Sequence, residues 1–212
     1  YIIKMSFTII VATDINGGIG LLKNDEYSIP WKNSIDMKFF KDTTSSKTEK
    51  KAVIMGRNTY ESLPVKKLPD RTNIVLTSNP SLIDCSDVIC EASLDSALKY
   101  CFTNKLKPYV IGGSKLYEEA LNDHRLETIL WNIITETNED CNIHFPISFK
   151  EAQNKFNLDS YYELSKITYE SLQFYKFNNM TSNNDETNYL GKLNEILTDG
   201  DERQTRNSVT KS

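Results

Sequence analysis

Short apolar runs alternate with segments of helical spacing along the first 178 residues. Buried strands are predicted for five apolar, β-branched runs that are too short for helices, at 7–12, 51–55, 72–77, 108–111 and 128–134. A shorter strand is predicted at 88–90. Helices are predicted between these strands, at 33–46, 57–64, 93–101 and 115–121. Strands that alternate with helices favour an α/β fold with a mostly parallel sheet and helices on both faces.

The segment 161–178 has a different pattern. Its alternation of apolar and polar residues predicts either a closing antiparallel pair of strands or one long strand with a bulge. Because no helix separates these late strands, the sheet is expected to end antiparallel. The predicted fold is a mostly parallel central sheet of about eight strands with an antiparallel C-terminal strand. Residues 21–29, which follow a glycine-rich turn, are expected to form a polar loop.

Composition narrows the class of protein. With 212 residues, 39% of them hydrophobic and 25% charged, the chain suits one globular domain with an appendage. The net charge of −4 implies no nucleic-acid partner, and no apolar run is long enough to span a membrane. The four cysteines form no CxxC pair and no zinc-like cluster with His124 or His144. We therefore expect reduced thiols, no metal and a cytoplasmic location.

A single carboxylate stands out at the start of the predicted helix 33–46. Asp36 follows Trp31 by five residues and precedes Phe40 by four, and we expect it to share an otherwise apolar helical face with Met37 and Phe40. An aspartate on an apolar face needs a partner, which is either a protein group or a ligand. The alternative is an ordinary helix N-terminal aspartate, solvated and attracted to the helix dipole.

Two predicted strands run through glycine into a helix, at Gly56-Arg57-Asn58-Thr59 and at Ile111-Gly112-Gly113-Ser114-Lys115. Free N–H groups at a helix N-terminus suit phosphate, and Arg57 adds a forked cation. Each junction alone is equally compatible with a tight turn, but together with Asp36 they indicate a long diphosphate ligand across the strand ends. Arg71 is either a carboxylate-binding residue at the mouth of this cleft or a surface arginine in a turn.

Seven motifs, in order, make residues 5–178 resemble the dihydrofolate reductase family. They are IIVA (9–12), GIG (18–20), IPW followed by Asp36 and Phe40, VIMGRNTYESLP (53–64), LPDR (68–71), VIGGSKLYEEAL (110–121) and HFP (144–146). The resemblance implies that NADPH gives a hydride to C6 of the dihydropterin while N5 takes a proton, which converts 7,8-dihydrofolate to tetrahydrofolate. It also implies binding of antifolates such as methotrexate. We expect this domain to start near Met5.

The resemblance assigns roles to residues of the substrate site. Asp36 would bind the pterin 2-amino and N3 groups and, with its pKa raised by desolvation, help the proton reach N5. Trp31 would order a water near this proton path, and Arg71 would pair with the glutamate α-carboxylate. The other substrate-binding residues would be Ile10, Val11, Ala12, Met37, Phe40, Leu68, Ile111 and Asn132.

The cofactor site implied by the resemblance uses both glycine junctions. Arg57 and Thr59 would hold cofactor phosphates, joined by Thr77 and Ser78 at the adenosine end. Gly112-Gly113 would form the family's unusual cis peptide. The full set implied for cofactor binding is Ala12, Ile19, Gly20, Gly56, Arg57, Asn58, Thr59, Leu76, Thr77, Ser78, Ile111, Gly112, Gly113, Ser114, Lys115, Leu116 and Tyr117.

Three departures from the family pattern are visible. The lid between Gly20 and Pro30 is longer than usual. The family's threonine that bonds to the acid is replaced by Asn132 or, in another register, by Ile133; we favour Asn132, because an amide can replace that hydrogen bond. Ser78-Asn79 lacks the arginine that some members use for the 2′-phosphate, but Arg57 and Lys115 can compensate, so NADPH is favoured over NADH.

The chain continues beyond the expected end of this domain. Residues 179–187 are polar and are expected to be a linker. Residues 188–212 resemble the start of thymidylate synthase, with Arg206 as the arginine that grips the nucleotide phosphate; the alternative is a solvated C-terminal helix. The resemblance implies the front of a fused reductase–synthase whose catalytic synthase part is missing here, and a homodimer formed only through that part.

Two rival interpretations stay open. One is a related pyrimidine reductase of riboflavin synthesis, but IPW followed by Asp36 argues against it. The other is a non-catalytic folate- and NADPH-binding or scaffolding domain. The long lid and the replaced threonine leave that interpretation open, whereas Asp36 and Arg57 argue against it.

Overall fold

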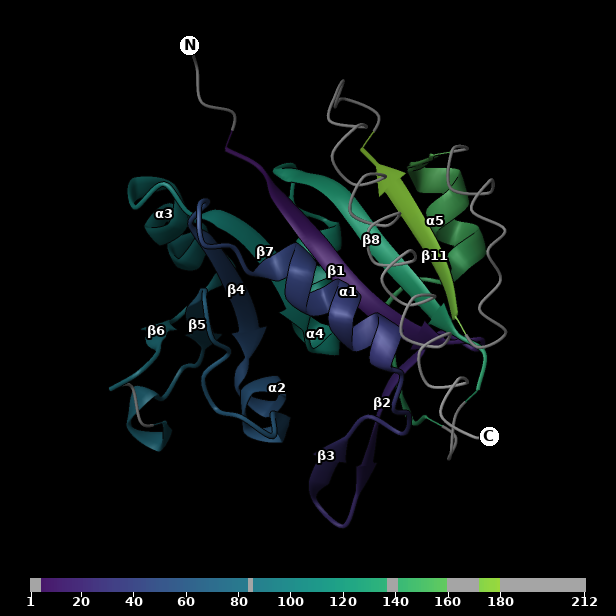
Figure 1. The fold of residues 1–212 in the computed structure, drawn as a ribbon, viewed down its shortest axis with the longest axis horizontal. Coiled ribbons are helices and arrows are strands. Elements are labelled where there is room, and N and C mark those ends of the chain that lie inside the picture. The colour runs from purple at the N-terminus through teal and green to yellow at the C-terminus, as the bar shows by residue number, and fades with distance from the viewer. Residues whose placement is uncertain (1–4, 84–85, 137–140, 160–171, 180–212) are drawn as a thin grey trace, which may run out of the picture.

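The structure, a computed structural model, describes residues 5–83, 86–136, 141–159 and 172–179. Within them an eight-stranded sheet forms the centre of the molecule (Figure 1). Its strands, in spatial order, are β10 (Asn157–Leu158), β11 (Leu172–Asn178), β8 (Leu126–Ile134), β1 (Phe7–Asp14), β7 (Lys107–Gly112), β4 (Lys51–Gly56), β5 (Thr72–Leu76) and β6 (Ile89–Glu91).

The direction of the strands agrees with the predicted fold. From β8 through β1, β7, β4 and β5 to β6, all neighbours are parallel, whereas β11 runs antiparallel to both β8 and β10. The parallel strands are buried on both faces, which explains their continuous apolar sequences. Ile9 and Val11 pack into one apolar core, and Ile10, between them, packs into the other.

Helices cover both faces of the sheet, as predicted. One core contains Phe39 of α1 (Ser34–Thr44) and Tyr60 of α2 (Arg57–Ser62). The other core contains apolar residues of α3 (Leu94–Thr103), α4 (Ser114–Leu121) and α5 (Phe149–Lys155). A short 3-10 helix, η1 (Pro80–Leu82), follows β5. In Figure 1, α1 crosses in front of the central strands.

The polar loop predicted at 21–29 is wrong. These residues belong to a β-hairpin of β2 (Gly18–Lys23) and β3 (Glu26–Ser28), and β2 also pairs with β9 (Ile143–His144). The hairpin turn consists of Asn24 at φ 52° and Asp25 at φ 63°. Asn and Asp tolerate this left-handed conformation, and a two-residue turn of this kind matches the twist of the strands that it joins.

The cysteines differ in part from the sequence prediction. Cys90 is disulfide-bonded, so the prediction of four reduced thiols is wrong for this residue, while Cys101 and Cys141 form no disulfide. CxxC and zinc-like spacings do not predict a disulfide of this kind, because its two cysteines need only be close in the fold.

None of the helices in the described part of the chain has the length and apolar character of a membrane span. The segment 160–171 and the tail 180–212, with Arg206, lie outside the described residues.

Candidate active site

Asp36 lies in the first turn of α1 and points into the protein. The Asn33 side chain caps this helix by accepting hydrogen bonds from the N–H groups of Ile35 and Asp36. The Asp36 side chain is largely buried and accepts a 2.8 Å hydrogen bond from Asn132 Nδ2. Burial raises the pKa of Asp36, and the Asn132 hydrogen bond opposes part of that rise.

The register of the sheet brings Asn132 to the acid. Asn132 stands opposite Ala12 of β1 and Phe174 of β11. Its neighbours two residues away, Leu130 and Ile134, pack into the core that also holds Phe39, so alternation along β8 turns Asn132 toward α1. Among the described residues, nothing donates to Asn132 Oδ1, although this atom is buried. A buried acceptor without a donor is unusual in a folded protein, and a ligand that carries a donor is one way to satisfy it.

Most of the predicted substrate residues gather beside this pair. One apolar cluster contains Ile10, Ala12, Trp31, Phe40, Leu68 and Ile111. Two residues that were predicted to bind substrate lie outside this cluster. Val11 packs into the core on the other face of the sheet, because side chains of a strand alternate between faces. Met37 is 60% exposed, because one residue along a helix is a rotation of about 100° from Asp36; the buried α1 residue that packs beside the acid is Phe39.

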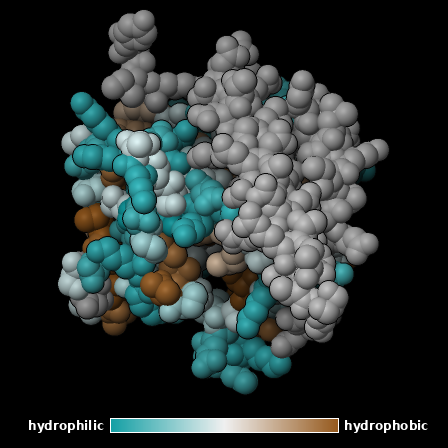
Figure 2. Space-filling view, in the orientation of Figure 1, coloured by the Kyte–Doolittle hydropathy of each residue, from teal (hydrophilic) through white to brown (hydrophobic). Residues whose placement is uncertain are grey.

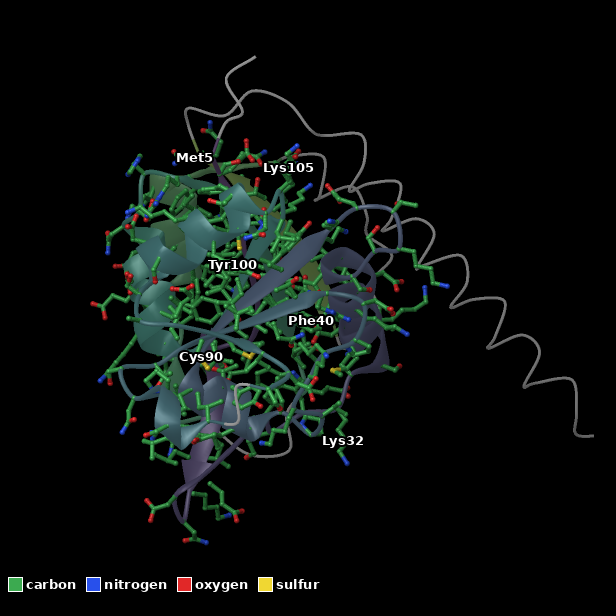
Figure 3. All side chains as sticks on the ribbon, turned by 90° about the vertical axis from the view of Figure 1, so that its left-hand side faces the viewer. Met5, Lys32, Phe40, Cys90, Tyr100 and Lys105 are labelled. Carbon is green, nitrogen blue, oxygen red and sulfur yellow. The ribbon has the colours of Figure 1, made fainter. Side chains whose placement is uncertain are left out.

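The visible part of the described surface is largely hydrophilic, with separate apolar spots (Figure 2). Exposed apolar side chains of the chain include Ile29, Met37 and Val65. Of the α1 region, Figure 3 shows Lys32 extending away from the ribbon, whereas Phe40 lies among other side chains.

Arg71 lies where the chain enters β5, against the C-terminal half of α1. Its guanidinium donates from Nη1 to Thr44 Oγ1 and from Nε to Pro69 O at 2.9 Å, and lies 5.7 Å from the centre of the Phe40 ring. No carboxylate forms an ion pair with Arg71 in the described part of the chain, unlike Arg125, which pairs with both Asp95 and Asp123. An arginine placed in this way can receive an external carboxylate.

The two glycine junctions meet at the carboxyl ends of β4 and β7, which are neighbours in the sheet. Gly56 and Gly113 occupy the N-cap positions of α2 and α4, and neither helix has a side-chain cap. The other three described α-helices are capped by Asn33, Ser93 and Ser148. A Cβ added at Gly56 would lie 3.8 Å from Gly113 N, so the two helix starts are close together. Free N–H groups at both starts are suited to an anion.

Close contacts surround these helix starts. The Gly112–Gly113 peptide bond is cis, and Gly112 has φ 128°, which favours glycine. Thr59 Oγ1 would lie 3.2 Å from a Cβ at Gly113. Two residues predicted to bind the cofactor already have protein partners: Arg57 Nε lies 3.3 Å from Glu61 Oε1, and Asn58 Nδ2 donates to Tyr27 Oη at 2.7 Å.

The other residues predicted to bind the cofactor form hydrogen bonds within the protein, lie exposed or pack in the core. Tyr117 Oη donates to Ile10 O at 2.9 Å, and Ser114 Oγ donates to His144 O at 2.8 Å. Thr77 Oγ1 accepts from the N–H of Asn79, while Ser78 and Lys115 are exposed. Ile19, Leu76, Leu116 and Tyr117 pack in the core on the face opposite α1. These four side chains therefore lie across the sheet from Phe39 and Trp31.

Three residues that the sequence did not single out also contact this region. Thr44 contacts Arg71, Tyr27 contacts Asn58, and Asn73 holds the loop that precedes β5. Only Asn73 had a visible signal, because it is a polar residue inside the otherwise apolar strand TNIVL. Tyr27 carried none, since its position depends on the hairpin that was not predicted.

The fold and this arrangement define an α/β oxidoreductase-like site of the dihydrofolate reductase type, and comparison with known proteins agrees. Residues 6–179 match the family model of dihydrofolate reductase, and the chain belongs to this family. The resemblance seen in the sequence is therefore confirmed. A solved dihydrofolate reductase from Schistosoma mansoni superimposes with a TM-score of 0.67 and 30% identity, covering 82% of this chain and 98% of that one.

Other similar proteins extend the comparison. A dihydrofolate reductase from Enterococcus faecalis, solved with NADP(H) and RAB-propyl, gives a TM-score of 0.64 and 26% identity over 84% of this chain and 98% of that chain. The bifunctional dihydrofolate reductase-thymidylate synthase of Daucus carota is 36% identical over 159 residues, which are 68% of this chain and 29% of that protein. The corresponding Paramecium tetraurelia protein is 29% identical over 214 residues, covering 96% and 43%. The chain thus spans less than half of these two relatives.

Proposed function

We propose that the protein catalyses NADPH-dependent reduction of 7,8-dihydrofolate to 5,6,7,8-tetrahydrofolate. The observation that carries this proposal is the buried Asp36–Asn132 pair beside an apolar cluster, in which Asn132 Oδ1 receives no hydrogen bond from the described residues. A carboxylate and an amide oxygen at this place match a flat, partly apolar ring system that carries amino and N–H donors. The pterin of dihydrofolate has that chemistry.

In the proposed complex, Asp36 accepts from the pterin 2-amino and N3 groups, and the unpaired Asn132 Oδ1 is a further acceptor for the amino group. Phe40 and Leu68 pack against the pterin and benzoyl rings. Arg71, which has no carboxylate partner in the described residues, pairs with the glutamate α-carboxylate. Methotrexate, which has a similar ring system and glutamate, is expected to occupy the same site.

The cofactor half of the proposal rests on the two uncapped helix starts. NADPH supplies the hydride when bound; the protein supplies position and electrostatics. Gly56 and Gly113 leave the N–H groups of α2 and α4 free for phosphate oxygens, and both glycines lack a side chain that would block a close approach. Arg57 reaches a phosphate only if it leaves or shares its contact with Glu61. Lys115, Thr77 and Ser78 are the additional polar residues proposed for the phosphates and adenosine end.

Asp36 also accounts for the proton. Because burial raises its pKa, the carboxyl holds a proton at a higher pH than a solvated aspartate does. A proton held at Asp36 can reach N5 of the pterin through a water ordered near Trp31, which is buried in the same apolar cluster. Hydride addition at C6 and protonation at N5 together complete the reduction of the C=N bond.

The whole protein is proposed to be a fused dihydrofolate reductase–thymidylate synthase. The similarity to the Paramecium protein covers 96% of the chain, which residues 6–179 alone cannot supply, so it supports a synthase-like segment at 188–212 after a linker at 179–187. In this proposal Arg206 binds the nucleotide phosphate, and the synthase portion forms the homodimer. A cytoplasmic location, without nucleic-acid or membrane partners, fits the net charge of −4.

The deciding experiment measures NADPH oxidation by the 212-residue chain when dihydrofolate is added, with methotrexate binding measured in parallel by calorimetry. The proposal predicts turnover that stoichiometric methotrexate abolishes. Tight methotrexate binding without turnover would support the non-catalytic folate-binding interpretation. Absence of both, in a protein that unfolds cooperatively, would contradict the proposed function.

A further inference from the structure

We infer that Asn73 is a positioning residue for the substrate carboxylate, which it serves by holding the loop that carries Leu68 and Arg71. This inference rests on the proposed function, because it concerns how that substrate is gripped. Asn73 belongs to β5, and its side chain is buried, with 2% of its surface exposed. It makes no contact at the Asp36–Asn132 pair, so its effect has to pass through the loop.

One side-chain amide binds the loop at both ends. Asn73 Oδ1 accepts from Leu68 N at 3.0 Å, and Nδ2 donates to Leu68 O at 2.9 Å and to Arg71 O at 3.1 Å. This pattern needs an acceptor and two donors in one plane, which among small side chains only asparagine supplies. An aspartate would keep the contact to Leu68 N but lose both donated bonds.

Other contacts also hold this region: Leu68 packs against the apolar cluster, and Lys67 Nζ lies 2.9 Å from Asp87 Oδ1. A cavity of about 390 Å³ lies against it, lined by Lys67, Arg71, Asn73, Asp87 and Tyr100, the last of which is labelled in Figure 3. The loop also contains Asp70 at φ 60°, a conformation that non-glycine residues rarely adopt. Among these contacts, the hydrogen bonds of Asn73 are the ones that hold the backbone groups of both Leu68 and Arg71.

The position of the Arg71 guanidinium follows from this backbone path. From its anchored backbone, the side chain turns back to Pro69 O and across to Thr44 Oγ1 and the Phe40 ring. A shift of the loop away from Asn73 moves both Arg71 and Leu68 relative to α1. The pterin end of the site, formed by Asp36 and Asn132, would stay unchanged.

The test compares two substrates in the Asn73→Asp and Asn73→Ser variants of the full chain. Dihydrofolate carries the benzoylglutamate, and 6-methyl-7,8-dihydropterin lacks it. Losing hydrogen bonds that orient a charged group is expected to raise the KM for dihydrofolate about tenfold while kcat changes less than about twofold. The KM for 6-methyl-7,8-dihydropterin is expected to stay within about twofold of wild type.

Two controls separate a positioning role from a structural one. Asn104→Asp makes the same chemical change at an exposed residue that donates to Tyr100 O, outside the proposed site, and should leave both KM values unchanged. Combining Asn73→Asp with Arg71→Gln should lose less discrimination than the two single effects would give together, because part of the Asn73 effect passes through Arg71. Parallel increases in KM for both substrates, or additive effects in the double variant, would overturn the inference.

A binding experiment distinguishes failure of this inference from failure of the proposed function. Calorimetry with the same two ligands needs no turnover and measures the same discrimination. If wild type binds dihydrofolate more tightly than the pterin and the Asn73 variants lose that preference, the inference holds even in a protein that is not catalytic. If wild type binds neither ligand, the proposed function fails and the inference fails with it.

Discussion

Helices α1 and α3 both begin with an aspartate in the first turn, but the two carboxylates have opposite environments. Asp36 of α1 is buried, and its side chain accepts a hydrogen bond from the neutral amide of Asn132. Asp95 of α3 is exposed and lies 2.9 Å from both Lys99 Nζ and Arg125 Nη1. Burial raises the pKa of Asp36, whereas hydrogen bonds to Lys99 and Arg125 lower the pKa of Asp95.

The N-terminal ends of the helices also differ, because some have a side-chain cap and others have none. Ser93 closes the start of α3 with a capping box, while Gly56 and Gly113 leave the starts of α2 and α4 without side-chain caps. The local sequence satisfies α3 completely, as helix rules expect. At the starts of α2 and α4, in the proposed site, the backbone N–H groups have no side-chain cap and can bind a ligand. This contrast indicates which of several similar helix starts belongs to a ligand site.

The largest effect is expected from neutralising the buried carboxyl. Asp36→Asn removes the acid and is expected to lower kcat/KM for dihydrofolate by at least about 100-fold, because a positioned acid or base contributes that much. Asp95→Asn makes the same change at the exposed carboxylate and should leave kcat/KM unchanged. Steady-state NADPH oxidation measures both, and equal values for the two variants would remove the functional distinction between these aspartates.

A smaller effect is expected when Asp36 loses its partner. Asn132→Leu removes the hydrogen bond that opposes the rise in pKa, so the pKa of Asp36 should rise further. The protonated acid then persists to higher pH, and the alkaline limb of the activity profile should move to higher pH. The KM for dihydrofolate should also increase about tenfold, from the loss of a buried acceptor. An unchanged pH profile would mean that Asn132 does not tune the acid.

A serine at Gly56 should give α2 the kind of cap that α3 has. Gly56 has φ −73°, and an added Cβ meets its nearest neighbours at 3.8 and 3.9 Å, so the residue fits without strain. Gly56→Ser is expected to stabilise folding by a few tenths of a kcal/mol, and to weaken NADPH binding about tenfold by occupying the helix start. Urea denaturation and fluorescence titration measure these quantities. Unchanged NADPH affinity would contradict the role proposed for the open helix start.

The reverse change at α3 should affect stability alone. Ser93→Ala removes the capping side chain and is expected to lower the free energy of unfolding by about 1 kcal/mol. The kinetic constants and the NADPH affinity should stay at wild-type values, because α3 takes no part in the proposed site. A change in NADPH affinity comparable to that of Gly56→Ser would show that helix capping affects the site indirectly.

The sequence predicted those parts of the fold that depend on local patterns. Runs such as Lys51 to Met55 identified the parallel strands, because both faces of such strands are buried. The β2–β3 hairpin was not predicted because its short strands carry no regular apolar alternation, and its turn of Asn24 and Asp25 lacks the glycine that usually marks such a turn. The helical spacing also predicted that Met37 shares an apolar face with Asp36, but Met37 is exposed because it is rotated away from Asp36 on α1.

The site was predictable where a resemblance supplied the residues, but not where tertiary contacts decide. Spacing alone left Asp36 as either a solvated or a buried aspartate, because that depends on β8, which lies 96 residues further along the chain at Asn132. The contacts of Arg57 with Glu61 and of Asn58 with Tyr27 likewise needed the structure. The roles of these residues in binding stay predictions until the variants are measured.

One titration tests the difference between the two aspartates directly. Carboxyl 13C shifts of both residues can be followed with pH in a single sample labelled at aspartate, with assignments from Asp36→Asn and Asp95→Asn. The structure predicts that the pKa of Asp36 lies above the ordinary value of an aspartate and that the pKa of Asp95 lies below it. If Asp36 titrates at or below Asp95, its carboxyl is not the buried, proton-holding group on which the proposed reduction depends.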